Sequence, residues 1–171
     1  MPVILVIGPS HAGKSTLTGL VLADLARGNE PQRGVTGINL DEVLGSSHRS
    51  NAQKALDLIT KESQRSEIIL IDCGAGLLAF SATFRAFVTT NSMAVIAVWC
   101  NDETFRSRHS PETIERELVN NYSPDLIAIW EIAQARRHLV DNSCGTSLSE
   151  SCERMKAIIA RIADEETWFA A

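Results

Sequence analysis

The chain has 171 residues, of which 44% are hydrophobic and 22% are charged, and its formal net charge is −5. This length and composition are typical of one globular domain, which we expect to span residues 1–171. The net negative charge and the lack of a Lys/Arg cluster argue against a nucleic-acid partner. No apolar run approaches the roughly 20 residues that a membrane span requires, so no membrane partner is expected either.

The cysteines and the N-terminal residues indicate a compartment. The spacing of Cys73, Cys100, Cys144 and Cys152 matches no metal site. Cys73 and Cys100 adjoin apolar runs, which predicts buried free thiols in a reducing compartment. Residues 1–7 are apolar but lack the charged region of a signal peptide. We therefore expect a cytoplasmic protein.

The first predicted elements are a strand and a helix. Residues 3–7 form a continuous, largely β-branched apolar run, which predicts a strand buried on both faces. Apolar residues recur at helical spacing over 15–26, which predicts a helix. Residues 29–37 contain proline and glycine and are expected to form a loop. A weak second strand over 38–40 then leads to Asp41.

The rest of the chain continues to alternate strands and helices. We expect strands over residues 68–71, 94–99 and 138–140, and helices over 51–62, 77–90, 125–134 and 149–163. The polar, arginine-bearing segment 101–124 is expected to hold one helix and a mobile loop. This alternation predicts an α/β fold with a five-stranded parallel sheet and helices on both faces.

The strongest motif, Gly-x-x-x-x-Gly-Lys-Ser, occupies residues 8–15 between the first strand and the first helix. Glycines permit a tight turn and a close approach of the backbone to phosphate, lysine adds a full charge, and serine offers a hydroxyl to Mg²⁺. The motif predicts a three-layer P-loop NTPase fold with ATP and Mg²⁺ as cofactors. The residues expected to bind the nucleotide are Gly8, Ser10, His11, Ala12, Gly13, Lys14, Ser15 and Thr16. The alternative is a glycine-rich turn with an incidental lysine.

Asp72 directly follows the apolar run 68–71. An acid at the tip of a buried strand beside the first strand is the usual partner of such a loop, because it orients Mg²⁺ or its waters. We therefore expect Ser15 and Asp72 to be the metal ligands, and the alternative is a surface aspartate that begins a turn. Gly74 and Gly76 would let a substrate approach the backbone at this point.

Two features separate this chain from the regulatory GTPases. Residues 60–63 read Thr-Lys-Glu-Ser and do not complete a guanine-recognition motif, and the third residue after Asp72 is Ala75 where Asp-x-x-Gly needs glycine. A small chain with a charged segment after the strand at 94–99 fits a phosphotransferase better.

The chain resembles the shikimate kinase branch of the nucleoside-monophosphate-kinase-like P-loop kinases. Residues 8–16 match the phosphate loop of that family, and residues 39–41 stand where it has Asp-x-Asp. Residues 73–76 resemble its glycine-rich substrate loop. Residues 98–108 resemble the entry into its lid, which implies a lid over residues 101–124. Residues 130–141 resemble its last helix and strand.

This resemblance implies roles for single residues. Lys14 would stabilise the transferring phosphoryl group, and Asp41 would meet the acceptor hydroxyl as a base or orienting group. Arg108 would close over the adenine or the phosphates, and Arg116 would be a second lid arginine. The alternatives are a helix N-cap for Asp41 and solvated helix charges for both arginines.

Two departures from the family bear on the substrate. Asn39 replaces the first acid of Asp-x-Asp, and no Phe-Arg-x-x-Glu follows the second strand. The family uses that second motif to bind the carboxylate of shikimate, so a different hydroxylated small molecule is expected.

The expected function is an ATP-dependent phosphotransferase that moves the γ-phosphoryl group to a hydroxyl or phosphate of a small molecule. Two other functions stay open: a catalytically silent ATP-binding module, and a regulatory nucleoside triphosphatase that works with a protein partner. An oligomer is compatible with the sequence but is not indicated by it.

Overall fold

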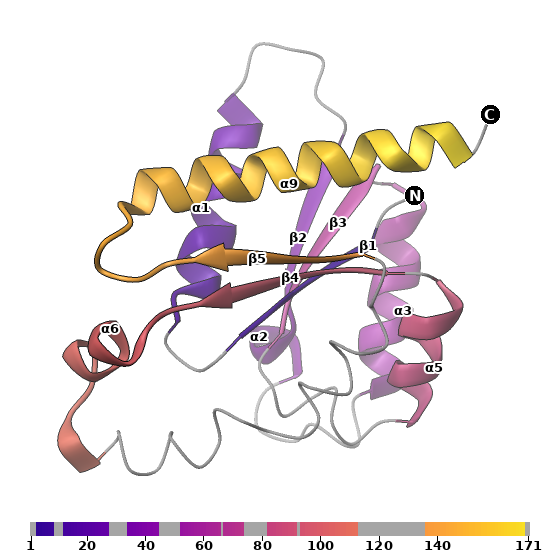
Figure 1. The fold of residues 1–171 in the computed structure, drawn as a ribbon. Helices are drawn as coiled ribbons and strands as arrows, with labels where there is room; N and C mark the ends of the chain where they lie inside the picture. Colours follow the sequence, from indigo (N-terminus) through magenta and orange to yellow (C-terminus); the bar gives the residue numbers. More distant parts are fainter. Residues whose placement is uncertain are drawn as a thin grey trace.

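The computed structural model describes residues 3–8, 12–27, 34–44, 52–65, 67–73, 82–91, 93–112 and 136–169. The strands are β1 (Val3–Ile7), β2 (Val35–Asn39), β3 (Ile68–Asp72), β4 (Ala94–Trp99) and β5 (Arg137–Asp141). The helices are α1 (Lys14–Arg27), α2 (Leu40–Leu44), α3 (Ala52–Ser63), α5 (Ala82–Thr90), α6 (Asp102–Ser107) and α9 (Leu148–Phe169) (Figure 1).

The five strands form one sheet in the order β2-β3-β1-β4-β5, and every neighbouring pair is parallel. The predicted five-stranded parallel sheet is therefore confirmed. β1 lies at the centre of the sheet, with β3 and β4 on either side of it. β2 and β3 are therefore added on one side of β1, and β4 and β5 on the other. In parallel sheets ligands bind at the point where the chain changes sides in this way, beyond the carboxyl ends of the strands.

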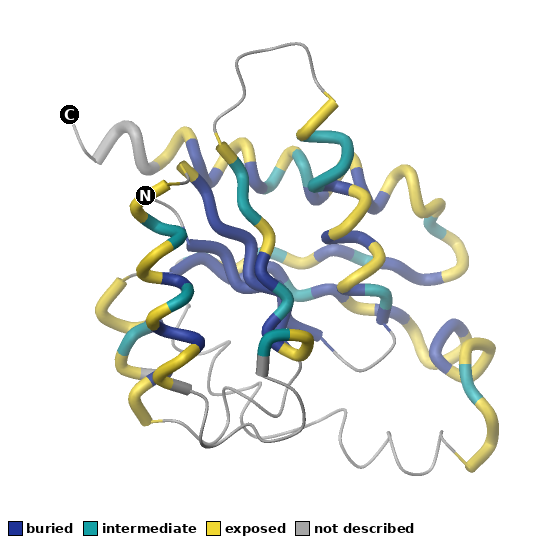
Figure 2. The backbone as a smooth tube through the Cα atoms, turned by 180° about the vertical axis from the view of Figure 1, so that it is seen from behind, coloured by how far each residue is buried: buried dark blue, intermediate teal, exposed yellow. Residues whose placement is uncertain are grey.

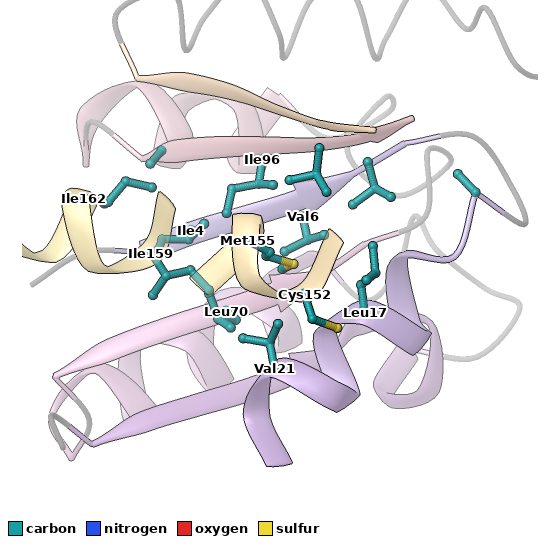
Figure 3. Close-up of a cluster of buried hydrophobic side chains, with 14 of the residues drawn as sticks. Ile4, Val6, Leu17, Val21, Leu70, Ile96, Cys152, Met155, Ile159 and Ile162 are labelled. Carbon is teal, nitrogen blue, oxygen red and sulfur yellow. The ribbon is translucent and has the colours of Figure 1, made fainter. Parts of the chain in front are cut away.

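Helices cover both faces of the sheet, as the alternation predicted. One face packs against α1 and α9, where Leu17 and Val21 of α1 and Met155 and Ile159 of α9 belong to one buried cluster with Leu70 of β3 and Ile96 of β4 (Figure 3). The other face packs against α2, α3 and α5. The central strands are accordingly buried along their length, whereas the helices alternate buried and exposed positions (Figure 2).

The sequence-based boundaries around β2 are wrong. The strand begins at Val35, so the predicted loop over 29–37 is wrong from that residue onward, and Leu40 begins α2 rather than ending a strand. Among the described strands β2 pairs with β3 alone, and it is partly exposed. An edge strand that contains Thr36 and Gly37 therefore carries a weak apolar signal.

Apart from the end of α9, the other described boundaries agree with the structure to within one residue. α9 extends to Phe169, beyond the predicted end at residue 163. The helix predicted over 125–134 and the first five residues of the helix predicted over 77–90 lie outside the described residues. No helix within the described ranges is long and apolar enough to cross a membrane.

Candidate phosphate-binding site

The strands bring several candidate residues to one edge of the sheet. Gly8 follows β1, Asp72 ends β3 and Asn142 follows β5. The register places Asn39, the last residue of β2, beside Asp72. Since all strands are parallel, their carboxyl ends meet at this edge, where a ligand is expected.

The turn between β1 and α1 requires glycine at two positions. Gly8 has a φ of 151°, and a Cβ atom there would overlap the carbonyl oxygen of Val98 in β4. Gly13 has a φ of 92°, and its Cβ atom would overlap Nδ2 of Asn142. Any residue with a side chain would be strained at both places. Close packing against neighbouring segments is thus a second reason for the two motif glycines.

Lys14 is the first residue of α1, and its side chain lies close to Gly8. It is only 8% exposed, and its Cδ atom lies 3.5 Å from the position that a Cβ of Gly8 would take. The start of α1 adds the partial positive charge of a helix N-terminus at the same place. A largely buried lysine at a helix N-terminus is well suited to bind an anion.

Asp72 faces the start of α1 from β3. It is 4% exposed and accepts a hydrogen bond from the side chain of Ser15. The prediction that this acid ends a buried strand beside β1 is confirmed, and the alternative of a surface aspartate is wrong. Burial raises the pKa of Asp72, whereas the Ser15 hydrogen bond and the charge of Lys14 act in the opposite direction.

Hydroxyl and carboxylate oxygens are the ligands that Mg²⁺ prefers, so Ser15 and Asp72 fit this ion chemically. In the part of the chain that the structure describes, no group of three or more His, Cys, Asp or Glu side chains could hold a metal. Mg²⁺ usually combines one or two carboxylates with the oxygens of a bound phosphate, and this donor set is adequate for such a site.

Asp41 lies in the first turn of α2 and is exposed. Asn39 is the capping residue of this helix, because its Oδ1 accepts hydrogen bonds from the backbone N–H groups of Asp41 at 3.0 Å and Glu42 at 3.3 Å. The alternative of Asp41 as the N-cap is therefore wrong. The negative charge of Asp41 is near enough to raise the pKa of Asp72.

Arg108 follows α6, and its guanidinium group reaches back to Gly13 in the turn that joins β1 to α1 (residues 8–13), named the phosphate turn here for the ligand that the sequence motif predicts. Nη2 donates a hydrogen bond of 3.1 Å to the carbonyl of Asn142. Nη1 lies 3.8 Å from the position that a Cβ of Gly13 would take. The side chain is exposed, but it is held beside the turn instead of extending into solvent.

Sequence analysis missed the loop that follows β5. Asn142 donates from Nδ2 to the carbonyl of Ala12 at 2.8 Å. Ser143 accepts from the backbone of Asn101 at 2.9 Å and donates to Asp141 at 2.6 Å. These bonds join the ends of β4 and β5 to the phosphate turn. The sequence carried little signal for Asn142, because β5 reads Arg-His-Leu-Val-Asp and buries Val140 alone among its five residues.

The cysteines behave as expected. Cys73 and Cys100 are buried and free, which confirms the prediction. The Cys73 thiol donates to the carbonyl of Val6 at 3.6 Å, and burial raises its pKa. Cys73 therefore helps to hold the end of β3 against β1 and is not a reactive thiolate.

Several predicted site residues lie outside the described residues, namely Ser10, His11, Gly74, Gly76 and Arg116. The lid segment is described only as far as residue 112. Thr16 is exposed on the first turn of α1. The functions assigned to these residues stay predictions.

Comparison with solved structures identifies the fold. A gluconokinase from Sinorhizobium meliloti 1021 is 14% identical, with a TM-score of 0.55, and the match covers 99% of this chain and 98% of that chain. Shikimate kinase from Aquifex aeolicus vf5 is 16% identical, with a TM-score of 0.53 and 99% coverage of both chains. Shikimate kinase from Bacteroides thetaiotaomicron is 14% identical, with a TM-score of 0.57, and covers 93% of this chain and 98% of that chain.

The chain has the fold of these kinases. The fold expected from the sequence resemblance is therefore confirmed over nearly the full chain. No family model and no curated protein sequence matches the chain. At 14–16% identity the likeness establishes the fold, so the function has to be inferred from the site.

Proposed function

We propose that this chain is an ATP- and Mg²⁺-dependent phosphotransferase that moves the γ-phosphoryl group to a hydroxyl, or a phosphate, of a small molecule. The observation that carries the proposal is the buried Lys14 at the start of α1, next to the hydrogen-bonded pair of Ser15 and Asp72. A buried cation, a helix N-terminus and a pair of oxygen ligands together suit a triphosphate with its metal ion.

The residues of the turn would bind the phosphates through backbone N–H groups. Lys14 would lie against the β- and γ-phosphates, and Arg108, already held beside Gly13, would neutralise charge from the opposite side. Ser10, His11 and Thr16 are included in this binding loop on the basis of the sequence motif alone. Arg116 is proposed as a second lid arginine on the same basis.

In the transfer step, the acceptor oxygen would form a bond to the γ-phosphorus while the bond between this phosphorus and the oxygen of the ADP leaving group breaks. Asp41 is exposed at the carboxyl edge of the sheet, where its carboxylate would accept the hydroxyl proton. Lys14 and Arg108 would stabilise the negative charge on the transferring group. Gly74 and Gly76 would border the acceptor.

Ser15 and Asp72 would hold Mg²⁺ together with oxygens of the bound phosphates. The ion would neutralise phosphate charge when it is bound. Positioning and charge neutralisation supply most of the catalysis in phosphoryl transfer.

The solved structures support a small-molecule acceptor, because they include a gluconokinase, a sugar kinase from Janibacter sp. HTCC2649 and shikimate kinases. The missing Phe-Arg-x-x-Glu motif argues against shikimate itself. A hydroxylated metabolite other than shikimate is therefore the proposed class of acceptor.

The first prediction tests this function by replacing Lys14. The protein would be screened for ATP-dependent phosphorylation of sugar acids, other hydroxylated metabolites, nucleoside monophosphates and antibiotics, with mass spectrometry of the products. For the acceptor found, we expect Lys14→Ala to lower kcat/KM by at least about a hundredfold, because a charge on the transferring group is lost. Lys54→Ala, which removes an exposed lysine of α3, is the matched control and should retain activity.

Circular dichroism would establish that both variants are folded, and Lys14→Met keeps the aliphatic stem if the alanine variant is unstable. Unchanged transfer by a folded Lys14 variant would contradict the proposed mechanism. Phosphate release without any acceptor would point instead to a nucleoside triphosphatase, and ATP binding without turnover would point to a silent module.

A further inference from the structure

Asn142 joins three parts of the candidate site, and no motif assigns it a role. It follows β5, is 5% exposed, and donates from Nδ2 to the carbonyl of Ala12 at 2.8 Å. Its backbone N–H donates to the carbonyl of Trp99 at 2.7 Å, and its own carbonyl accepts from Arg108 at 3.1 Å. The residue therefore ties the phosphate turn to the end of β4 and to an arginine of the proposed lid.

The bond to Ala12 fixes the orientation of one peptide group. The carbonyl of Ala12 and the N–H of Gly13 belong to the same peptide unit, which is planar and trans. The two groups consequently point in opposite directions. Because Asn142 holds the carbonyl, the N–H of Gly13 points away from Asn142. Gly13 stands immediately before Lys14, in the part of the loop whose backbone N–H groups are proposed to donate hydrogen bonds to the phosphates of the nucleotide.

Gly13 and Asn142 also fit together sterically. A Cβ on Gly13 would overlap Nδ2 of Asn142, so the amide group can reach Ala12 only because residue 13 is glycine. Ala12 is fully buried. Loss of the Asn142 side chain would leave the Ala12 carbonyl without this donor, and the peptide would be free to turn.

We propose that Asn142 is a positioning residue for the phosphates of the nucleotide. Its side chain sets the Ala12–Gly13 peptide so that the Gly13 N–H donates to phosphate, and its carbonyl holds Arg108 beside the same phosphates. This inference rests on the proposed function, since it assumes that the turn binds a nucleotide.

The test measures binding of three probes, namely Mg-ATP, inorganic triphosphate and adenosine, by titration calorimetry. In Asn142→Ala the dissociation constants of Mg-ATP and of triphosphate are expected to rise roughly tenfold, because one donor that orders the loop is lost. The constant for adenosine should change less than about twofold. Asn142→Asp should raise the first two constants further, because a carboxylate would face the Ala12 carbonyl, repel it and turn the Ala12–Gly13 peptide away from its present orientation.

Asn91→Ala is the matched control. Asn91 lies between the end of α5 and the amino end of β4, and so away from the carboxyl edge of the sheet. Its side chain also donates a hydrogen bond of 2.8 Å to a backbone carbonyl, that of Phe87. This variant should bind all three probes as the unchanged protein does. If Asn142→Ala fails to fold, Asn142→Asp has nearly the same volume and carries the test.

The outcomes separate the inference from the proposed function. If the unchanged protein binds Mg-ATP and a folded Asn142 variant binds it equally well, the inference is overturned and the proposed function stands. An equal loss for adenosine and triphosphate would also overturn it, because a general structural defect would act on both. If the unchanged protein binds neither Mg-ATP nor triphosphate, the proposed function fails, and the inference fails with it.

Discussion

Lys14 and Asp72 are charged side chains that the fold removes almost completely from water. Charged groups are seldom buried unless they have partners, and Asp72 receives a hydrogen bond from Ser15 and lies within the field of Lys14. These partners do not fully offset the loss of hydration of the Asp72 carboxylate, because its pKa is still raised by burial. The site therefore keeps a carboxylate at a cost to stability, which is common where function requires a charge.

The second prediction follows from this cost. A raised pKa means that the folded chain binds the proton more tightly than the unfolded chain, so the free energy of unfolding falls as pH rises through the folded-state value. Asp72→Asn removes the charge and keeps an oxygen that can accept from Ser15. Urea denaturation at pH 7 should therefore show a more stable variant, and the gain should vanish at a pH below the ordinary aspartate value of 3.8, where both side chains are neutral.

Asp57→Asn changes an exposed carboxylate of α3 and serves as control; its stability should change by less than about 0.5 kcal/mol. A lower stability of Asp72→Asn at pH 7 would contradict the prediction. The same variant should lose Mg²⁺-dependent transfer, because one of the proposed ligands is altered.

At the scale of single elements, α9 shows how a local signal fixes a boundary. The backbone N–H of Glu150 donates to Ser147 Oγ at 3.1 Å, and the backbone N–H of Ser147 donates to Glu150 Oε2 at 2.8 Å. This pair is a capping box, and it places the first helical residue at Leu148. The pattern Ser-x-x-Glu is visible in the sequence and is a better guide to the start of the helix than apolar spacing, which indicated residue 149.

The third prediction concerns this capping box. Ser147→Ala should lower the free energy of unfolding at pH 7 by about 1 kcal/mol, because the helix loses its N-terminal acceptor. Hydrogen bonds from Ser147 lower the pKa of Glu150 below 4.5. The backbone N–H of residue 147 is the main cause of this shift and is kept in the variant. The carboxylate contribution is present above the ordinary value and is lost as pH falls through the folded-state pKa, so both proteins should lose stability at low pH and their difference should change little.

Ser149→Ala, two residues further along the same helix, is the control for this experiment and should leave the urea midpoint almost unchanged. Equal effects of the two serine substitutions would show that the capping box does not stabilise the helix.

At the scale of the whole molecule, the sequence predicted the parts of the fold that depend on local patterns. The buried strands β1, β3 and β4 have strong apolar runs and were placed to within one residue. β2 was misplaced because it is a partly exposed edge strand, and such a strand needs few apolar residues and therefore gives a weak sequence signal. Strand order and register, by contrast, depend on contacts that no local pattern reports.

The same distinction applies to the candidate site. Gly8, Gly13, Lys14 and Ser15 could be predicted because they stand in one short motif. Asn142 could not, because its partner Ala12 lies 130 residues away in the chain. The contact exists only because β5 joins the sheet beside β4 and brings its carboxyl end to the edge where the phosphate turn lies.

The central claim is that the turn between β1 and α1 binds the phosphates of a nucleotide. A crystal structure with Mg²⁺ and a non-hydrolysable ATP analogue tests it most directly. We predict phosphate oxygens within hydrogen-bond distance of the backbone N–H groups of Gly13, Lys14 and Ser15, with Mg²⁺ at the Ser15 hydroxyl. A nucleotide bound elsewhere, with these N–H groups facing solvent, would contradict the account.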